Sequence, residues 1–372
     1  MNLPLPWPST HLHRTTKSVE RVLDDSLGIY STQPTGHLEL AARVSGYQLD
    51  DLTRVVEEDR TAVRLSTLRG SGFVIPTHLV PVVHAASIRR RVRSFAGPLA
   101  RNLTTDYESW ANRIEAVLAG EMMAPQEIKE RLGPLGDDAG LMRFVIRTMA
   151  NECRIVAARV TGSWRSDRTL FTLWSEWLPG VDVHILGEVE AREQLARLYL
   201  DRHGPATIAD FSFWSGVPKG QSRKAIESVA EPVSGGNYWA THEFEAHPPP
   251  PVRLLPMWDT LFVTYRDRSR FVRPEHYPLV YDKDGNATLV VLVEGWAAGV
   301  WNLGKDDDHL EIKAAPFDEF SRQVWDGIEE EAHRIGRLIG SASVTIMRGE
   351  GPTDLTTQPR NRFMNPLRFQ KK

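Results

Sequence analysis

The chain has 372 residues, of which 41% are hydrophobic and 25% are charged, an ordinary globular composition that suffices for two or three domains or a tandem array of small modules. A formal net charge of -3 excludes overall basicity as the basis of nucleic-acid binding, so such a surface has to come from local clusters. The single cysteine, Cys153, excludes a disulfide framework, and no apolar run approaches the roughly 20 residues of a membrane span, so we expect a soluble cytoplasmic protein.

The stretch 28–44, GIYSTQPTGHLELAARV, begins as a loop and continues as a helix. Gln33 stands directly before Pro34, and the helix ends at Arg43. The simplest interpretation is that Gln33 caps the helix or hydrogen-bonds the turn that Pro34 enforces. We interpret the nearest carboxylates as helix-surface charges: Asp24, Asp25 and Glu39.

Two of the following segments share one order of elements. Residues 47–76 predict a helix, a second helix and a strand that ends at Pro76. Residues 124–133 predict a short helix, and residues 141–160 a long helix that runs into a strand. Residues 163–174 then have the pattern of a wing and its return strand. Both segments therefore follow the order of a winged helix.

The same order is clearest in residues 203–240. Thr207, with Asp210 three positions later, predicts the start of a short helix, and a second helix runs to about Val229. Gly235-Gly236 predicts the turn of a short hairpin. Helix, turn, helix and wing make a winged helix, a module that contacts DNA or proteins with about equal expectation. The second helix exposes these polar side chains: Lys219, Gln221, Arg223 and Lys224.

The chain changes character at four consecutive prolines, residues 248–251, which predict an extended linker. Period-two, β-branched segments that predict strands follow at residues 260–267, 288–295, 297–303 and 309–315. Glu294-Gly295 predicts a hairpin turn between two of these strands. We expect a compact antiparallel sheet or small barrel, closed by a helix over residues 318–339. The tail from Arg348 onward is basic; a solvated tail is the favoured interpretation, and a basic arm on DNA is the alternative.

Arginines are the candidates for contacts with phosphate. Arg69 lies in a glycine-containing loop, and four arginines within residues 89–93 form a dense cluster on a predicted helix. Arginines at every second position of residues 266–270 would share one face of a strand. The complete set of predicted DNA contacts is Arg43, Arg69, Arg89, Arg90, Arg91, Arg93, Lys219, Arg223, Lys224, Arg266 and Arg268.

The element order predicts an α+β protein of three tandem winged-helix units, followed by a compact antiparallel sheet or small antiparallel β-barrel with a closing C-terminal helix. The boundaries that we expect are 15–100 for the first unit with the loop at Gln33, 101–187 for the second, 188–247 for the third, 248–346 for the barrel and 347–372 for the basic tail.

Three segments carry a resemblance to a known family: residues 203–229, residues 254–272 and the LRGSGFVIP segment at 68–76. They resemble bacterial winged-helix DNA-binding proteins that include AlkZ-type DNA glycosylases, and the likeness extends from about Arg21 to Ile339. The resemblance implies a C-shaped arrangement around DNA. It also implies a monofunctional glycosylase activity on alkylated purines, including bulky adducts and crosslinks.

The family's catalytic signature is two glutamines, or a glutamine and an aspartate, separated by one residue in the loop before a helix that ends in Ala-Arg. Here Gln33 matches the second amide, and Ser31 occupies the position of the first. An ungapped register would instead place Ser31 on the second amide. The helix end, residues 40–43, matches the family's pattern. The resemblance therefore implies Gln33 as the catalytic residue, and the chemistry of the neighbouring side chains adds Ser31 or His37 as its helper.

Chemistry shows what a single amide can contribute. An alkylated purine is cationic and already a good leaving group, so the enzyme mainly has to position a water beneath a sugar of oxocarbenium character. A neutral carboxamide can hold this water through its oxygen. No lysine occurs between Lys17 and Lys129, which argues against a Schiff-base lyase step from this segment.

The sequence leaves two candidate functions. The favoured one is a DNA glycosylase of DNA repair that acts on alkylated purines. The alternative is a non-catalytic winged-helix protein that senses damage or regulates transcription. For either we expect a nucleoid-associated monomer on double-stranded DNA, with no cofactor, no metal, no membrane and no obligate protein partner.

Overall fold

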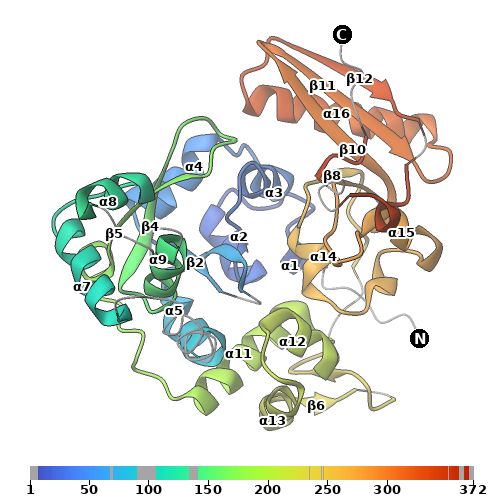
Figure 1. Ribbon diagram of the computed structural model, residues 1–372. Coiled ribbons are helices and arrows are strands. Elements are labelled where there is room, and N and C mark those ends of the chain that lie inside the picture. Colours follow the sequence, from blue (N-terminus) through green and yellow to red (C-terminus); the bar gives the residue numbers. More distant parts are fainter. Residues whose placement is uncertain are drawn as a thin grey trace.

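A computed structural model of the protein describes residues 7–67, 70–89, 106–133, 141–233, 235–243, 245, 247–350, 352–359 and 364–367. In Figure 1 the elements form an open arc, with the C-terminal sheet at one end. The opposite side holds the helices α7 (Tyr107–Leu118), α8 (Pro125–Leu132) and α9 (Met142–Asn151). No helix in these described ranges has both the length and the apolar character of a membrane span. Several predicted DNA contacts lie outside them: Arg69, Arg90, Arg91 and Arg93.

The N-terminal region consists of short helices around a hairpin. Its elements are α1 (Trp7–Thr10), α2 (Val19–Ser26), β1 (Ile29–Tyr30), α3 (Thr35–Arg43), α4 (Leu49–Thr53) with a π-helical turn (Arg54–Glu58), β2 (Ala62–Ser66), β3 (Gly72–Pro76), a 3-10 turn (Thr77–Leu79), α5 (Val80–Val83) and a second π-helical turn (His84–Ile88). The expected second helix before Pro76 is wrong, because this segment is strand β2. Val63 and Leu65 are buried in one apolar cluster and Ala62 in another, so both faces of the strand are covered.

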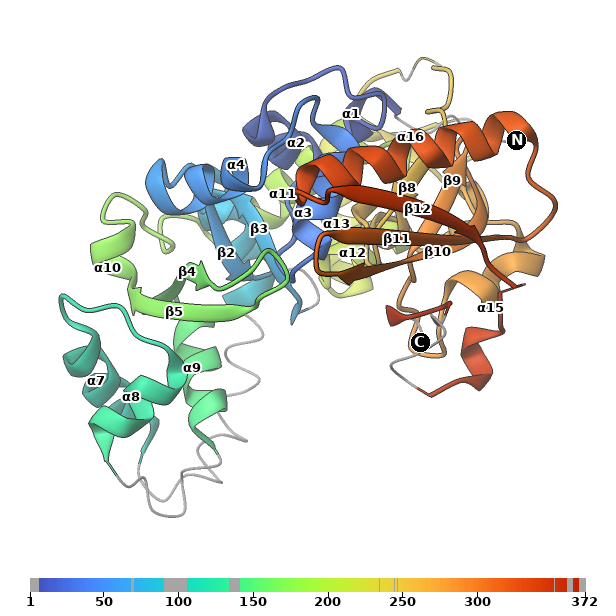
Figure 2. The same cartoon turned by 90° about the horizontal axis from the view of Figure 1, so that it is seen from above.

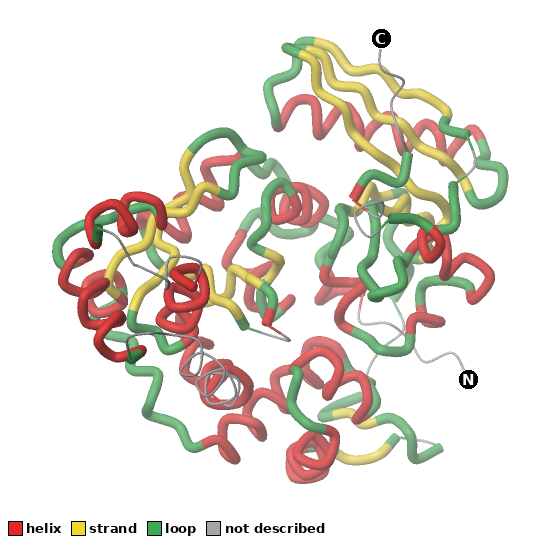
Figure 3. The backbone as a smooth tube through the Cα atoms, viewed as in Figure 1, coloured by secondary structure: helices red, strands yellow, loops and turns green. Residues whose placement is uncertain are grey.

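The next region completes the same sheet. It contains α7 (Tyr107–Leu118), α8 (Pro125–Leu132), α9 (Met142–Asn151), β4 (Ile155–Thr161), β5 (Arg168–Leu173) and α10 (Trp174–Trp177). The predicted short helix, long helix and return strand are confirmed. Five strands form the order β1-β3-β2-β4-β5, with β2 and β4 joined at Arg64 and Ala157. Figure 3 shows the strands of the molecule in yellow among its helices in red. The first two expected units therefore share one sheet.

The segment from α11 to β7 has helices and a hairpin in the predicted order. Its elements are α11 (Glu188–His203), α12 (Ile208–Ser215), α13 (Lys219–Val229), β6 (Glu231–Pro232) and β7 (Trp239–Ala240). The predicted start of α12 is confirmed, because the Thr207 hydroxyl accepts the Asp210 N–H at 3.0 Å while the Asp210 carboxylate accepts the Thr207 N–H at 3.0 Å. The β6–β7 hairpin is also confirmed, with Glu231 opposite Ala240.

The C-terminal region is an open sheet with a helix on one face. It contains β8 (Arg253–Leu255), α14 (Thr260–Thr264), 3-10 turns at Arg268–Arg270 and Pro274–His276, α15 (Tyr277–Val280), β9 (Val290–Val293), β10 (Trp296–Asp306), β11 (His309–Pro316), α16 (Arg322–Leu338), β12 (Ser343–Arg348) and a 3-10 turn at Leu355–Thr357. The Glu294-Gly295 turn between β9 and β10 is confirmed, with positive φ at both residues.

The expected closed barrel is not found in the described residues. The strand order is β12-β11-β10-β9-β8, with β12 parallel to β11 and β8 at the opposite edge. Helix α16 runs along this sheet (Figure 2), and its residues Ile328, Ala332 and Ile335 pack with Leu310 of β11. Gly336 permits the close approach, since a Cβ there would lie 2.4 Å from a methyl group of Val344. A helix covers the apolar face that a barrel would enclose.

Candidate active site

The loop at residues 31–35 extends from an edge strand into helix α3. Strand β1 pairs with β3 through Tyr30 and Phe73, and the Ser31 N–H continues this ladder by donating to the Gly72 carbonyl at 3.1 Å. The peptide bond between Gln33 and Pro34 is cis, and α3 begins directly after it at Thr35. The loop is therefore held at both of its ends by regular structure.

The Gln33 side chain is buried and does not cap α3. The backbone N–H of Gln33 donates to Asp167 Oδ1 at 2.8 Å, across 134 positions of sequence. Its carboxamide oxygen is buried and has no hydrogen-bond partner among the described residues. The simple interpretation that Gln33 caps the helix through its side chain is therefore wrong.

An open groove of about 530 Å³ lies beside this loop, between α9 and the β2–β4 part of the sheet. Ser31, Thr32 and Asp167 line it, whereas the buried Gln33 is not among its lining residues. A second hollow of about 780 Å³ shares six lining residues with the groove and extends it along α8. Basic side chains line the two: Arg64, Lys129, Arg143, Arg147 and Arg168. The combined groove offers several cations to an anionic ligand.

Arg64 and His37 form the buried side of the site. Burial lowers the pKa of Arg64, whose guanidinium lies 3.5 Å from the Glu57 carboxylate. Burial, and then the positive charge of Arg64, lower the pKa of His37 to about 4. The His37 Nδ1 lies 2.7 Å from the Tyr47 hydroxyl. His37 is therefore a neutral, buried ring engaged with Tyr47. Among the described residues, no group of three or more His, Cys, Asp or Glu is arranged to hold a metal.

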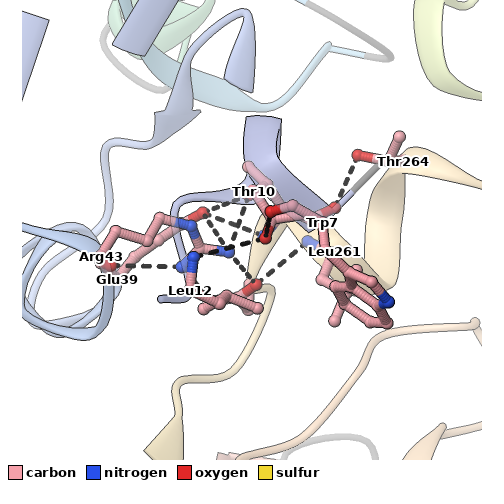
Figure 4. A network of polar contacts seen from close by, with 9 residues as sticks. Trp7, Thr10, Leu12, Glu39, Arg43, Leu261 and Thr264 are labelled. Carbon is pink, nitrogen blue, oxygen red and sulfur yellow. Dashed lines mark hydrogen bonds and ion pairs between the residues drawn. The ribbon is translucent and has the colours of Figure 1, made fainter. Parts of the chain in front are cut away.

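The C-terminal end of α3 lies in a buried polar network (Figure 4). Arg43 is 1% exposed and donates to both oxygens of Asp259, at 2.8 and 2.7 Å. Glu39, fully buried one turn earlier, accepts the Thr260 N–H at 3.0 Å. The prediction that Arg43 contacts DNA is wrong, because its charge is neutralised in the interior. The interpretation of Glu39 and Asp25 as surface charges is wrong too, because both are buried.

The remaining predicted basic contacts fall in different surroundings. Arg89 donates to the carbonyl oxygens of Val183 and Leu186, at 3.1 and 3.3 Å, and so holds a neighbouring loop. The expected strand at residues 260–267 is wrong, because Asp259 accepts the Leu261 N–H and caps the short helix α14. Arg266 is consequently exposed in a loop, while Arg268 stacks on the Tyr281 ring at 3.7 Å. Three remain exposed along α13: Lys219, Arg223 and Lys224.

Sequence reasoning missed several residues of the groove. Arg143 and Arg147 lie on α9 one turn apart, a spacing that places both on one helix face and was the available signal. Asp167 belongs to the loop between β4 and β5, and no local pattern connects it to Gln33. Its place at the site follows from the pairing of β4 with β2, which brings the second hairpin beside the first.

Comparisons with known proteins give a family for the sequence and a related fold. The chain matches the family described as DNA glycosylase AlkZ-like over residues 24–338. No curated protein matches it. Among solved structures, it is similar to the DNA glycosylase AlkZ of Streptomyces sahachiroi, with a TM-score of 0.74 and 19% sequence identity over 94% of this chain and 100% of that chain. That likeness shows a shared fold, and the family match spans most of the sequence. The chain belongs to the AlkZ-like DNA glycosylase family.

Proposed function

We propose that the protein is a monofunctional DNA glycosylase that hydrolyses the N-glycosidic bond of alkylated purines in double-stranded DNA. Family membership supports glycosylase chemistry. The observation that places the reaction at this loop in our proposal is the buried carboxamide oxygen of Gln33, which has no hydrogen-bond partner among the described residues. Leaving such an acceptor unsatisfied costs about 1–3 kcal/mol. A water that binds at this oxygen during the reaction would satisfy the buried acceptor.

The catalytic step needs little from the protein beyond position. The cationic purine leaves with the bonding electron pair, and a water attacks C1′ of the sugar. In our proposal this water reaches Gln33 Oε1 from the groove side of the loop, at Ser31 and Thr32, and donates a hydrogen bond to it. His37 is neutral in this site, because its pKa is about 4, and it supports the loop through Tyr47.

The DNA backbone is proposed to follow the basic groove. Arg143 and Arg147 are exposed on its α9 wall, and Lys129 and Arg168 extend the positive charge along the neighbouring hollow. The exposed residues of α13 supply further phosphate contacts. A groove open along its length would admit bulky adducts and crosslinked bases. The proposed enzyme is a monomer, and its three winged-helix units have the boundaries expected from the sequence.

Incubation with duplex DNA containing 7-methylguanine tests the function directly. We expect free 7-methylguanine in the supernatant, with no strand break until the abasic sites are cleaved by alkali. Gln33→Ala should slow base release by about 100-fold, the effect of removing one positioned transition-state group. Gln194→Ala, which removes an exposed amide from α11, is the matched control.

The alternative function is a non-catalytic protein that senses damage or regulates transcription. The observation in its favour is Ser31, which stands where the family has its first glutamine. Tight binding of alkylated duplex without release of any base from a panel of N3- and N7-alkylated purines would support this alternative and refute the glycosylase.

A further inference from the structure

We infer that Asp167 is a catalytic residue, the carboxylate that receives the proton of the attacking water. The inference rests on the proposed glycosylase function. It goes beyond that function by adding a base from the second hairpin, whereas the loop at residues 31–35 contains no carboxylate of its own. The groups that the proposal brings together are the Asp167 carboxylate, the Gln33 amide and the groove lined by Ser31 and Thr32.

The hairpin tip, residues 162–167, spans the loop at residues 31–35. On one side Asp167 lines the large groove, and on another Arg165 lines a cavity of about 240 Å³ together with Pro34 and Thr35. Between them, Trp164 packs against the core of the C-terminal sheet. Figure 2 shows the β4–β5 hairpin reaching toward that sheet. The position of Asp167 is thus fixed by contacts on both sides of the loop.

The two carboxyl oxygens of Asp167 have different surroundings. Oδ1 accepts the Gln33 N–H at 2.8 Å, and this bond fixes the direction of the group. The side chain is exposed and lines the groove. The proposal therefore places Oδ2 on the side from which substrate arrives. Arg64 already has the buried Glu57 as its ion-pair partner at 3.5 Å. Arg64 is therefore neutralised by Glu57, and the negative charge of Asp167 is not needed for that purpose.

The negative charge of Asp167 is unfavourable for the affinity of the groove for DNA. It stands among cations that would attract phosphates, and a carboxylate there repels the same phosphates. It is favourable once C1′ develops positive charge, because a nearby carboxylate stabilises an oxocarbenium ion. A residue that weakens ground-state binding and stabilises the transition state serves the reaction rather than the affinity.

The step balances without a further reactant. The C1′–N bond breaks and its electron pair leaves with the purine, while the water oxygen forms the new bond to C1′. The proton of that water moves to Oδ2 of Asp167, and Gln33 Oε1 accepts the second O–H. The products are the free base and an abasic sugar with a hydroxyl group at C1′.

The test separates the charge of Asp167 from its hydrogen bond. Asp167→Asn keeps an oxygen acceptor for the Gln33 N–H and removes the charge, whereas Asp167→Ala removes both. Asp307→Asn, in the exposed turn between β10 and β11, is the matched control. Single-turnover release of 7-methylguanine is measured at pH 7, together with affinity for undamaged duplex and the thermal unfolding midpoint.

We expect Asp167→Asn to slow release by about 100-fold or more, as for loss of a general base. Its affinity for undamaged duplex should equal or exceed that of the wild type, and Asp167→Glu should recover part of the rate. Release by Asp167→Asn within twofold of the wild type would overturn the inference. Absence of release by the wild type itself would instead refute the glycosylase proposal, and the inference with it.

Discussion

Arg43 and Asp259 form a two-point ion pair in the interior, with donor–acceptor distances of 2.8 and 2.7 Å. The pair connects the last turn of α3 with the start of α14, 216 positions later in the chain. Glu39, on the same helix, accepts a hydrogen bond from the backbone of Thr260. The helix that follows the loop at residues 31–35 is therefore fixed to the C-terminal half of the molecule.

Removal of Asp259 should strongly destabilise the protein. Asp259→Ala leaves the buried Arg43 charge with only the more distant Glu39, at 3.8 Å, an effect of about 3–5 kcal/mol on the free energy of unfolding. It also removes the cap at the Leu261 N–H. Urea denaturation at pH 7 measures the loss, and Arg54→Ala, which breaks the exposed pair with Asp51, is the control at about 1 kcal/mol or less. Similar small losses in both variants would contradict the structural role of the pair.

Glu39 should give stability an unusual pH dependence. Burial, and then the charge of Asp259, raise the pKa of Glu39 from 4.5 to about 8. The folded state then binds more protons than the unfolded chain between these values, so this group's contribution to stability falls as pH rises through the window. Glu39→Gln keeps an oxygen acceptor for Thr260 and does not titrate.

Urea unfolding of the wild type and Glu39→Gln at pH 5, 6, 7 and 8 tests this expectation. The stability of the wild type relative to the variant should decrease toward pH 8, by at most about 1.4 kcal/mol per pH unit for one proton. A difference that stays constant from pH 5 to pH 8 would show that Glu39 has no raised pKa.

Local signals in the sequence predicted the elements whose ends are chemically marked. Thr207 with Asp210 marks the start of α12, and Glu294-Gly295 marks the turn between β9 and β10. The segment Thr260–Thr264 is rich in β-branched and aromatic residues, which favours a strand. All five residues are buried, so their sequence shows no helical periodicity. The segment is nevertheless a helix, whose first turn is capped by Asp259.

The site was predictable only where its residues are neighbours in sequence. Gln33 follows from the loop before α3, but its contact with Asp167 depends on two hairpins meeting in one sheet. Arg43 likewise has the sequence context of a surface arginine at a helix end. Its burial follows from Asp259, far away in the chain, and no spacing rule connects the two.

The basic groove predicts which arginine affects DNA binding. Arg143→Ala should reduce the slope of log affinity against log salt concentration by about one unit, because one phosphate contact is lost. Arg197→Ala, an exposed arginine of α11 that does not line the groove, should leave the slope unchanged. Fluorescence anisotropy on undamaged duplex between 50 and 300 mM salt measures both. Equal slopes for the two variants would place the DNA elsewhere on the protein.

Gly72 and Ser31 test the space around the loop. A Cβ at position 72 would lie 2.6 Å from the Ser31 hydroxyl oxygen, so Gly72→Ala has to displace that hydroxyl. We expect base release to fall about tenfold or more, since a small misplacement of a positioning loop is costly. Ser31→Ala in the same background removes the clash, because the Ser31 Cβ is at an ordinary 4.0 Å. If the double variant is as slow as Gly72→Ala alone, displacement of the hydroxyl is not the cause.

Ser31→Gln should raise activity above that of the wild type. The substitution restores the pair of amides separated by one residue, and the absence of a side chain at Gly72 leaves room beside the longer one. Ser31 lines the groove, so a glutamine at this position would extend toward the water that we propose to bind at Gln33. Single-turnover release of 7-methylguanine by Ser31→Gln, Ser31→Asn and the wild type measures the gain, with the shorter amide as the control for reach. Release by Ser31→Gln at or below the wild-type rate would show that a second amide at this position does not share the water with Gln33.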